Sequence, residues 1–430
     1  MRQFDYVIIG NGAAGVSGCE GIRKLDQKGT IAILSDEPVL PYIRCLLPDL
    51  ISGRVPAKNL TFRPEKFYEK SQIELMLGKR TVSIDVGSKQ LLTDDGEALQ
   101  FGRLLIATGS SATLPESSRK NLEGVFTLRT MEDAEGISRA AAGAKRAVIL
   151  GGGLVGLESA IALRLRGLEV CVVVASEQVL SQNIDRSAAG IVKRHLEDNG
   201  IRILLGTDVL EILGEKKVEG ARLSNEAILE CDLIVSAKGV RMNTELAENA
   251  GISVGRGIMV DERMRTNVPD IYAAGDVAQA RELISGRNAV MTVWPVAAEQ
   301  GRVAGMNMAG GEMIYQGGLQ INTVDFLGLP IVSMGETREP RDLSELKFSI
   351  SSHPERKSYR KLVLRDGKII GVILIGDAAG EGSYTSMACT RIDVRTVRGL
   401  LLGKDLDYAK LAHALLVKDA NLKPSSTPTT

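Results

Sequence analysis

The sequence predicts an α/β protein with two Rossmann-like, three-layer dinucleotide-binding domains, the second inserted in the first, and a smaller α+β C-terminal domain. Three observations favour this fold class. One pattern of strand, glycine turn, helix and strand occurs twice, a later strand at 271–274 returns the chain to the first unit, and short strand-like runs begin at about residue 318. The predicted boundaries are 1–112 with 241–317 for the first domain, 113–240 for the second and 318–418 for the third, with a disordered tail at 419–430.

The first copy of the pattern begins with the apolar run Tyr6–Ile9 and continues into the turn Gly10-Asn-Gly12-Ala-Ala-Gly15. A helical segment and a second strand at 30–34 follow. In such a turn the first glycine makes the tight bend, the second lets the backbone approach a pyrophosphate, and the third lets the helix pack on the strand. The pyrophosphate then meets free N–H groups and the positive end of the helix dipole.

The second copy repeats this order, with a strand at 147–150, the turn Gly151-Gly-Gly153-Leu-Val-Gly156, a helical segment and a strand at 169–174. Each copy closes with a strand that ends in a glycine turn, at 101–109 and at 231–239. A single turn of this kind is a weak signal. Two copies that both open a βαβ unit predict two dinucleotide sites in one polypeptide.

In the third domain, strand-like runs alternate with turns, and an amphipathic helical end is expected from Ile392 to Val417. The apolar run Leu327–Val332 suits either the core or a dimer contact. His195, in the second domain, is expected on a surface helix.

The composition excludes several function classes. The 430 residues include 53 Lys plus Arg and 53 Asp plus Glu, so the formal net charge is zero, and neither nucleic acid nor an anionic membrane is an expected partner. No segment approaches the roughly 18 apolar residues of a transmembrane helix, and no leader pattern precedes the first strand. The five scattered cysteines show no metal-ligand spacing, so we expect a soluble cytoplasmic protein without a metal site.

Six stretches, in order, resemble the pyridine nucleotide–disulfide oxidoreductase superfamily: VIIGNGAAG, SDEPVLPYIRCLLPDLISG, LLIATGS, VILGGGLVGLESA, TNVPDIYAAGDVA and WPVAAEQGRVAGMNMAG. The chain is most similar to the branch with NADH:rubredoxin and ferredoxin reductases, the flavoprotein part of NADH nitrite reductase, NADH oxidases and coenzyme A-disulfide reductases. The resemblance implies an FAD-dependent NAD(H) oxidoreductase, in which the first domain binds FAD and the second binds NAD(H).

The resemblance also implies where FAD binds. Glu37, or else Asp36, would hold the adenosine ribose, and Arg44 would lie beside the flavin; the alternatives are a solvated turn carboxylate and a surface salt bridge. Asp276 is similar to the aspartate at the ribityl and pyrophosphate end, and a helix opening at Trp294 would present main-chain amides to the isoalloxazine. The implied FAD residues are Gly10, Gly12, Gly15, Asp36, Glu37, Arg44, Thr108, Gly109, Asp276, Trp294, Pro295, Glu299 and Gln300.

By the same resemblance, NAD(H) binds through the glycines of the second copy and of the turn that closes it: Gly151, Gly153, Gly156 and Gly239. Glu158 matches a family glutamate close to the nicotinamide, although a plain helix-face carboxylate is an equal alternative. Relatives carry an acidic residue where this chain has Val174, and Glu177 is the candidate substitute. No arginine cluster follows that would meet a 2′-phosphate, so NAD(H) is expected rather than NADPH.

Cys45 has two open interpretations. In NADH oxidases and coenzyme A-disulfide reductases a single redox cysteine lies near this point, whereas rubredoxin reductase relatives have proline here and share Arg44 and Leu47 with this chain. Cys45 is therefore either a redox thiol or a packing residue. The C-x-x-x-x-C pair and the His-Pro…Glu arrangement of the glutathione reductase type are absent from the sequence, so dithiol reduction of that type is not expected.

Three functions remain open. The first is electron exchange between NAD(H) and an iron–sulfur protein, either a rubredoxin- or ferredoxin-type carrier or a partner subunit of a complex such as a 2-oxoacid or carbon monoxide oxidising system. The second is a Cys45-dependent NADH oxidase or coenzyme A-disulfide reductase. The third is an FAD- and NADH-responsive binding protein like apoptosis-inducing factor. The residues around Cys45 favour the first, and both a homodimer and a heteromeric complex fit it.

Overall fold

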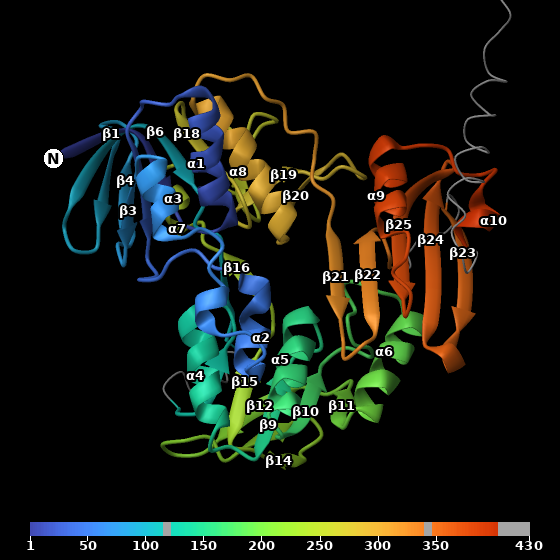
Figure 1. Ribbon diagram of the computed structural model, residues 1–430. Coiled ribbons are helices and arrows are strands. Elements are labelled where there is room, and N and C mark those ends of the chain that lie inside the picture. Colours follow the sequence, from blue (N-terminus) through green and yellow to red (C-terminus); the bar gives the residue numbers. More distant parts are fainter. Residues whose placement is uncertain (115–121, 339–345, 403–430) are drawn as a thin grey trace, which may run out of the picture. The chain divides into compact units, whose positions relative to one another are not determined.

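The computed structural model describes residues 1–114, 122–338 and 346–402, and the contacts among them divide it into two units (Figure 1). The first unit comprises Met1–Glu177 and Gly200–Gln320. The second comprises Gln178–Asn199 and the described residues from Ile321 onward. Both glycine turns therefore lie in the first unit.

The first glycine turn belongs to a sheet with the strand order β3-β2-β1-β6-β5-β4, and β18 pairs with the C-terminal half of β6. The strands are β1 (Arg2–Ile9), β2 (Ile31–Ser35), β3 (Ile73–Leu77), β4 (Thr81–Asp85), β5 (Gln90–Thr93), β6 (Ala98–Ile106) and β18 (Ile271–Ala273). The neighbours β3, β2, β1, β6 and β18 are parallel, and β2 is buried along its whole length, as in a parallel sheet covered on both faces. The return of β18 to β6 confirms the predicted insertion.

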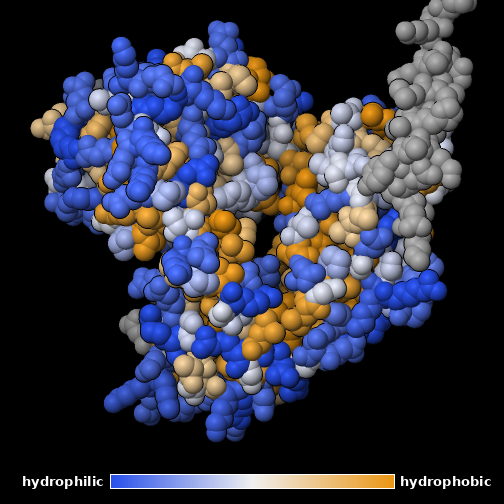
Figure 2. Space-filling view, viewed as in Figure 1, coloured by the Kyte–Doolittle hydropathy of each residue, from blue (hydrophilic) through white to orange (hydrophobic). Residues whose placement is uncertain are grey.

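Helices α1 (Ala13–Leu25) and α8 (Trp294–Met308) pack side by side on this sheet (Figure 1). The two backbones approach closely at Gly301. A Cβ atom at this position would overlap the carbonyl oxygen of Ala14, so the contact requires glycine. The remaining helices of this part are η1 (Arg44–Leu46), α2 (Leu47–Ser52), η2 (Ala57–Asn59), α3 (Glu65–Lys70) and α7 (Glu245–Asn249). On the face drawn in Figure 2, hydrophilic side chains cover most of this part of the first unit.

The second glycine turn belongs to a parallel sheet with the order β11-β10-β9-β15-β8. Its strands are β8 (Val125–Thr127), β9 (Arg146–Leu150), β10 (Glu169–Val174), β11 (Ile201–Leu205) and β15 (Leu233–Ser236), and its helices are α4 (Met131–Ala141) and α5 (Leu154–Leu165). The first unit also contains smaller sheets. One is formed by β12 (Val209–Leu213), β13 (Gly220–Leu223) and β14 (Ile228–Glu230), and another by β7 (Ser110–Ala112) and β16 (Val240–Met242). A further sheet is formed by β17 (Ile258–Met259), β19 (Ala278–Arg281) and β20 (Asn288–Val290).

The second unit contains an antiparallel sheet with the order β21-β22-β25-β24-β23. Its elements are α6 (Arg186–Asp198), β21 (Ile321–Asp325), β22 (Pro330–Gly335), β23 (Leu346–His353), η3 (Pro354–Arg356), β24 (Ser358–Arg365), β25 (Lys368–Ile375), α9 (Glu381–Thr390) and α10 (Arg398–Leu401). This sheet with helices is the α+β part that the sequence predicted. The run Leu327–Val332 forms the β21–β22 turn and the start of β22, where Leu329, Ile331 and Val332 are buried.

Helix α6 groups with this sheet, although the predicted boundaries placed residues 178–199 in the second domain. The N-cap residue Asp185 accepts hydrogen bonds from the Tyr359 hydroxyl at 2.7 Å and from the Lys361 ammonium at 2.8 Å. His195 is buried, so the expectation that it lies on the surface is wrong. Its Nε2 forms a hydrogen bond with the carbonyl oxygen of Phe326 at 2.8 Å. The partners of α6 thus lie more than a hundred residues later in the chain.

The predicted amphipathic helical end from Ile392 to Val417 is wrong in its first part. Residues 392–397 are not helical, and Asp393 instead forms a bridge with Lys368 at the start of β25. The rest of that prediction, and the tail at 419–430, lie largely or wholly outside the described residues. Among the helices that the structure describes, none has the length and apolar character needed to cross a bilayer.

Candidate cofactor-binding site

The first glycine turn has the geometry that a pyrophosphate cradle requires. Gly10 has a φ of +111°, and a Cβ atom there would overlap the carbonyl oxygen of Ala107. A Cβ atom at Gly15 would overlap the carbonyl oxygen of Gly10, so α1 packs directly on the turn. Gly12, the N-cap residue of α1, is different, because a Cβ atom there would meet nothing within 4 Å. The turn therefore leaves open space only at its second glycine.

The second glycine turn repeats the same three features. Gly151 has a φ of +113° with a Cβ position 2.6 Å from the carbonyl oxygen of Ala237, and a Cβ atom at Gly156 would overlap the carbonyl oxygen of Gly151. Gly153, the N-cap residue of α5, again faces open space. Both turns thus present a helix N-terminus beside a free volume, the arrangement that binds a phosphate group.

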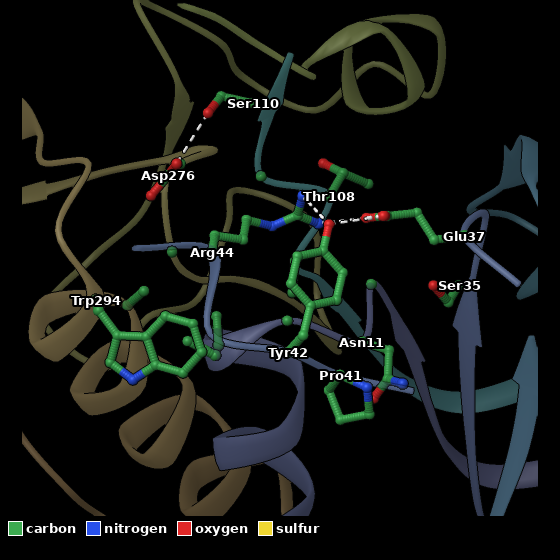
Figure 3. Close-up of a pocket in the computed structure, with 18 of the residues that line it drawn as sticks. Asn11, Ser35, Glu37, Pro41, Tyr42, Arg44, Thr108, Ser110, Asp276 and Trp294 are labelled. Atoms are coloured by element: carbon green, nitrogen blue, oxygen red, sulfur yellow. Dashed lines mark hydrogen bonds and ion pairs between the residues drawn. The ribbon is translucent and has the colours of Figure 1, made fainter. Parts of the chain in front are cut away.

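A cavity of about 170 Å³ opens in front of the first turn, at the carboxyl ends of β1, β2, β6 and β18 (Figure 3). Most of the implied FAD residues line it: Gly10, Gly12, Asp36, Glu37, Arg44, Thr108, Gly109, Asp276 and Trp294. Four do not, namely Gly15, Pro295, Glu299 and Gln300. The ends of parallel strands are where ligands bind in open α/β sheets, and here segments far apart in the chain meet at one cavity.

The side chains of two residues on α8 have other partners. Gln300 is buried and accepts a hydrogen bond from the Gly275 N–H at 2.9 Å, which holds the turn in front of Asp276. Glu299 pairs with Arg302 at 2.6 Å along the helix. These two side chains therefore support the cavity wall or the helix surface and do not face the cavity.

Glu37, Tyr42 and Arg44 form one hydrogen-bonded cluster on the cavity wall (Figure 3). The Arg44 guanidinium pairs with Glu37 at 2.5 Å and donates to the Tyr42 hydroxyl at 2.8 Å, and that hydroxyl donates to Glu37 at 2.7 Å. Asp36, in contrast, is exposed and also lines a neighbouring cavity. Of the two carboxylates implied for the ribose, Glu37 is thus already held by an arginine, and Asp36 is accessible.

Asp276 is held by two residues that the sequence reading missed. Its Oδ2 accepts hydrogen bonds from the Ser110 hydroxyl at 2.8 Å and from the Arg129 guanidinium at 2.5 Å. Arg129 follows β8 at the carboxyl edge of the second sheet and still lines the cavity in front of the first turn. Its position after a parallel strand is the sequence signal that could have identified it.

Asn11 contributes a hydrogen-bond donor without a partner. Its Oδ1 accepts from the Tyr68 hydroxyl at 2.6 Å, whereas its buried Nδ2 has no partner among the described residues. Buried polar groups are nearly always hydrogen-bonded, so an orphaned donor on a cavity wall favours a bound acceptor. With Arg44 and Arg129, it gives the cavity a donor set suited to the oxygens of an anionic group.

A second cavity of about 510 Å³ adjoins the first and shares Gly10, Asp36 and Thr108 with it. Its other lining residues are Ile9, Leu34, Lys79, Arg80, Thr81, Val82, Ser111, Arg241, Asn243, Glu245, Leu246 and Asn249. Because three residues line both cavities, the two cavities lie next to one another in the first unit.

Cys45 and Glu158 belong to neighbouring elements of the first unit, because α2, which follows Cys45 closely in the chain, packs against α5, which carries Glu158. Cys45 is exposed and lines the first cavity. The pKa of its thiol is raised, first by loss of water and then by the carboxylate of Glu158. Glu158 is on α5, which packs against α2, and its pKa is raised to about 7 by burial and by Asp49. The helix of the second turn thus packs beside the segment that carries Cys45.

The remaining implied NAD(H) residues lie at the carboxyl edge of the second sheet. Val174 packs under Gly152, whose Cβ position is 2.8 Å from the valine methyl group. Glu177 lies beyond β10 with its carboxylate 2.9 Å from the Cβ position of Gly206, at the end of β11. Gly239, with a φ of +99°, faces open space. The structure therefore brings Glu177 and Gly239 to the edge that carries Gly151 and Gly153.

Comparison with protein-family models gives two matches. The model described as pyridine nucleotide-disulphide oxidoreductase matches residues 4–301. The model described as rubredoxin NAD+ reductase C-terminal domain matches residues 321–386. The two matches fall on the first unit, together with α6, and on the sheet of the second.

Three curated relatives are similar along most of this chain. The assimilatory nitrate reductase electron transfer subunit of Bacillus subtilis is 32% identical over 95% of the chain, which spans only 51% of that relative. The NADH oxidase of Methanocaldococcus jannaschii is 32% identical, with 86% of this chain and 87% of the relative covered. The NADH-dependent phenylglyoxylate dehydrogenase subunit epsilon of Aromatoleum evansii is 30% identical, with 94% and 96% covered.

Among solved structures, the ferredoxin reductase of the CYP199A2 system from Rhodopseudomonas palustris superposes with a TM-score of 0.85 at 30% identity. The match covers 95% of this chain and 100% of the other. The fold of this chain is therefore similar to that of the ferredoxin reductase.

Proposed function

The chain belongs to the pyridine nucleotide-disulphide oxidoreductase family, and on this basis we propose that it exchanges electrons between NAD(H) and an iron–sulfur protein. The partner is either a rubredoxin- or ferredoxin-type carrier or an iron–sulfur subunit of a larger redox complex, such as a 2-oxoacid or carbon monoxide oxidising system. Membership of this family supports a more general description of the activity. The protein is an NAD(P)H-dependent flavoprotein oxidoreductase with FAD and NAD(H) as cofactors.

The residues of the first cavity fit FAD on structural grounds. The space at Gly12, the unpartnered amide of Asn11 and the guanidinium groups of Arg44 and Arg129 together suit a pyrophosphate and its neighbouring hydroxyls. Bound FAD supplies the conversion of one hydride into two separately released electrons. The protein's part is to hold Gly12 and Asp276 at fixed positions and to exclude water from the cavity wall.

The packing of α5 against α2 supports communication between the two cofactor sites. Glu158 is on the helix that starts at the second turn, and Cys45 is on the wall of the first cavity. The carboxyl group of Glu158 has a pKa of about 7, so it can hold or release a proton near neutral pH. In the balanced reaction NADH gives one hydride, two one-electron acceptors are reduced, and one proton is released.

The observation that carries the choice of partner is the match of residues 321–386 to the rubredoxin NAD+ reductase C-terminal domain. Two relatives support it by name, an electron transfer subunit and a subunit of a phenylglyoxylate dehydrogenase, and so does the ferredoxin reductase structure. The names of these proteins describe electron transfer, a dehydrogenase subunit or a ferredoxin reductase, and the extension to this chain is our proposal.

The test is NADH oxidation by the purified, FAD-loaded chain with a rubredoxin or a ferredoxin as acceptor, compared with oxygen and with the small acceptor menadione. We expect the iron–sulfur carriers to be reduced several-fold faster than oxygen. If menadione is reduced while no iron–sulfur carrier is reduced faster than oxygen, the proposed partner class is wrong and the flavoprotein assignment stands.

A second candidate, a Cys45-dependent NADH oxidase or coenzyme A-disulfide reductase, is favoured by two observations. The Cys45 side chain is exposed on the cavity wall, and an NADH oxidase is among the similar proteins. The raised pKa of the thiol weighs against it, because the thiolate is the reactive form. The first proposal is therefore preferred.

A further inference from the structure

The βαβ unit of the second glycine turn lacks a carboxylate at the end of its second strand. In dinucleotide-binding units of this kind, an acidic side chain about 20 residues beyond the turn accepts hydrogen bonds from the adenosine ribose hydroxyls of NAD. Here that strand, β10, ends in Val174, which is buried and packs against Gly152 of the turn. An acid that selects NAD(H) must therefore come from another segment.

Glu177, three residues beyond the strand, is not fixed in position. Its side chain is exposed and forms no ion pair with the residues that the structure describes. The carboxylate lies beside Gly206 at the end of β11, the outermost strand of this sheet. It is thus on the far side of β10 from the glycine turn, which follows β9. A side chain that is free in the unbound protein loses conformational entropy when it binds a ligand.

Asp208 is attached to the same strand end as Val174. The N–H of the preceding residue, Thr207, donates to the carbonyl oxygen of Val174 at 3.1 Å. The following residue, Val209, packs in one core cluster with Leu150, the last residue of β9. Asp208 is therefore held beside the carboxyl ends of β10 and β9.

The side chain of Asp208 is fixed by Lys238. Lys238 follows β15 at the carboxyl edge of the same sheet, and its backbone nitrogen is 3.7 Å from the Cβ position of Gly151. Its ammonium group pairs with Oδ1 of Asp208, and the Val209 N–H donates to the same oxygen at 2.7 Å. Because β10 and β9 lie between β11 and β15 in the strand order, the ion pair lies across the carboxyl ends of these two strands.

The ion pair remains accessible to a bound molecule. The side chains of Lys238 and Asp208 are 25% and 41% exposed. Oδ2 of Asp208 accepts no hydrogen bond from the described residues, so it is available to a ribose hydroxyl. An unpaired lysine at this edge would attract a 2′-phosphate, and the carboxylate of Asp208 opposes that attraction.

We propose that Asp208, held in place by Lys238, is the residue that selects NAD(H) over a cofactor with a 2′-phosphate. It substitutes for the acidic residue that is absent at Val174. The proposal goes beyond the proposed function, because it concerns the nicotinamide cofactor and does not depend on which protein accepts the electrons. The two cofactors carry the same nicotinamide, so the selection is made in binding.

The test is the binding of NAD⁺ and NADP⁺ to the FAD-loaded chain, measured by titration calorimetry. Neither ligand reduces the oxidised flavin, so the readout is affinity alone. We expect Asp208→Asn to lower the ratio of Kd for NADP⁺ to Kd for NAD⁺ by about tenfold, because asparagine keeps the shape of the side chain and frees the Lys238 ammonium. The matched control is Glu211→Gln, which removes a carboxylate on the strand after Asp208 from its pair with Arg222 and should leave the ratio within about twofold of wild type.

A double variant shows whether the gain in NADP⁺ affinity comes from Lys238. Lys238→Met should bind NADP⁺ no more tightly than wild type does. Asp208→Asn/Lys238→Met should lose the gain of Asp208→Asn, because no ammonium group remains to meet the 2′-phosphate. The comparison is made among variants that keep the FAD content and melting temperature of wild type.

Several results would overturn the assignment. It is wrong if Asp208→Asn leaves the ratio unchanged, and Glu177 is the selecting acid if Glu177→Gln alone lowers it. It is also wrong if the double variant keeps the full gain, or if wild type binds NADP⁺ as tightly as NAD⁺. None of these results bears on the iron–sulfur partner, which the carrier and menadione assays test separately.

Discussion

At the scale of single residues, the Cys45 thiol responds to its neighbours. The carboxylates of Glu158 and Asp276 raise its pKa, and the Arg129 guanidinium lowers it, while loss of water contributes the largest increase. The net effect favours the protonated thiol, which is a poor nucleophile. The electron-transfer proposal therefore does not need this side chain.

We expect Cys45→Ser to keep NADH-dependent carrier reduction within about twofold of wild type. Reduced wild-type protein should also lack a long-wavelength thiolate-to-flavin charge-transfer band. Steady-state rates and absorbance spectra of the two proteins check this, with Cys389→Ser, an exposed cysteine of the second unit, as the control. A band in wild type that disappears together with turnover in Cys45→Ser would favour the oxidase or disulfide reductase function.

Glu158 makes a second prediction at this scale, on pH dependence. Its pKa is raised from about 4.5 to about 7, so the protonated form is favoured in the folded state. Its contribution to stability is complete below the unfolded pKa and is lost as the pH rises toward 7, with a magnitude of about 1–3 kcal/mol. The unfolding free energy of Glu158→Gln minus that of wild type should therefore be larger at pH 8 than at pH 4.5. Denaturant titrations of both proteins at the two pH values measure this change.

The same substitution should remove a titration from catalysis. We expect the rate of flavin reduction by NADH to change near pH 7 in wild type and to be flat there in Glu158→Gln, as rapid mixing over a pH series would show. Glu135→Gln, an exposed carboxylate on α4, is the control and should leave the profile unchanged. An unchanged profile in Glu158→Gln would mean that this carboxyl does not titrate during the reaction.

At the scale of elements, the two glycine turns have the same geometry but face different sites, and this allows a paired test. A Cβ atom at Gly12 or at Gly153 enters open space, so neither Gly12→Ala nor Gly153→Ala should disturb the fold. We expect Gly12→Ala to lower FAD affinity by about tenfold and Gly153→Ala to raise KM for NADH by a similar factor with FAD retained. Flavin content after dialysis and NADH titrations measure the two effects; loss of flavin in Gly153→Ala would contradict the assignment of the turns.

Helix α6 gives a stability prediction. Its N-cap carboxylate, Asp185, and the Lys361 ammonium form a buried ion pair, with 6% and 2% of the side chains exposed. Removing one partner leaves the other charge buried and unpaired, which costs about 3–5 kcal/mol. Asp185→Ala should therefore lower the unfolding free energy by that amount in denaturant titrations. Asp198→Ala, which removes the exposed partner of Lys357, should cost less than about 1 kcal/mol.

The elements differ in how far the sequence determines them. The glycine turns could be located from the sequence because their constraints are local: a tight bend, a close approach and a helix start within six residues. The position of Arg129 after a parallel strand is also a local signal, but its partner Asp276 lies 147 residues away, so the contact between them could not be predicted from the sequence. His195 was misplaced for the same reason, since amphipathic spacing shows that one face is buried but not against what.

At the scale of the whole molecule, FAD should act as a stabilising ligand. A molecule that binds only the folded state raises its stability by mass action, by about 2.7 kcal/mol at a hundredfold excess over Kd. We expect the melting temperature of flavin-free protein to rise with FAD concentration and to rise less in Gly12→Ala. FMN, which lacks the adenosine half of FAD, should give a smaller rise. No shift with FAD in the wild-type protein would contradict the cavity assignment.

The path of the chain between the units limits how the protein can be dissected. The backbone enters the second unit at residue 178, leaves it at 199 and enters it again at 321, so no single cut separates the two. A fragment truncated after residue 320 would keep α6 and lose Tyr359, Lys361 and Phe326, which satisfy Asp185 and His195. Such a fragment would leave Asp185 and His195 without these partners. Helix α6 cannot be removed as well, because residues 178–199 form the crossover between the parallel strands β10 and β11.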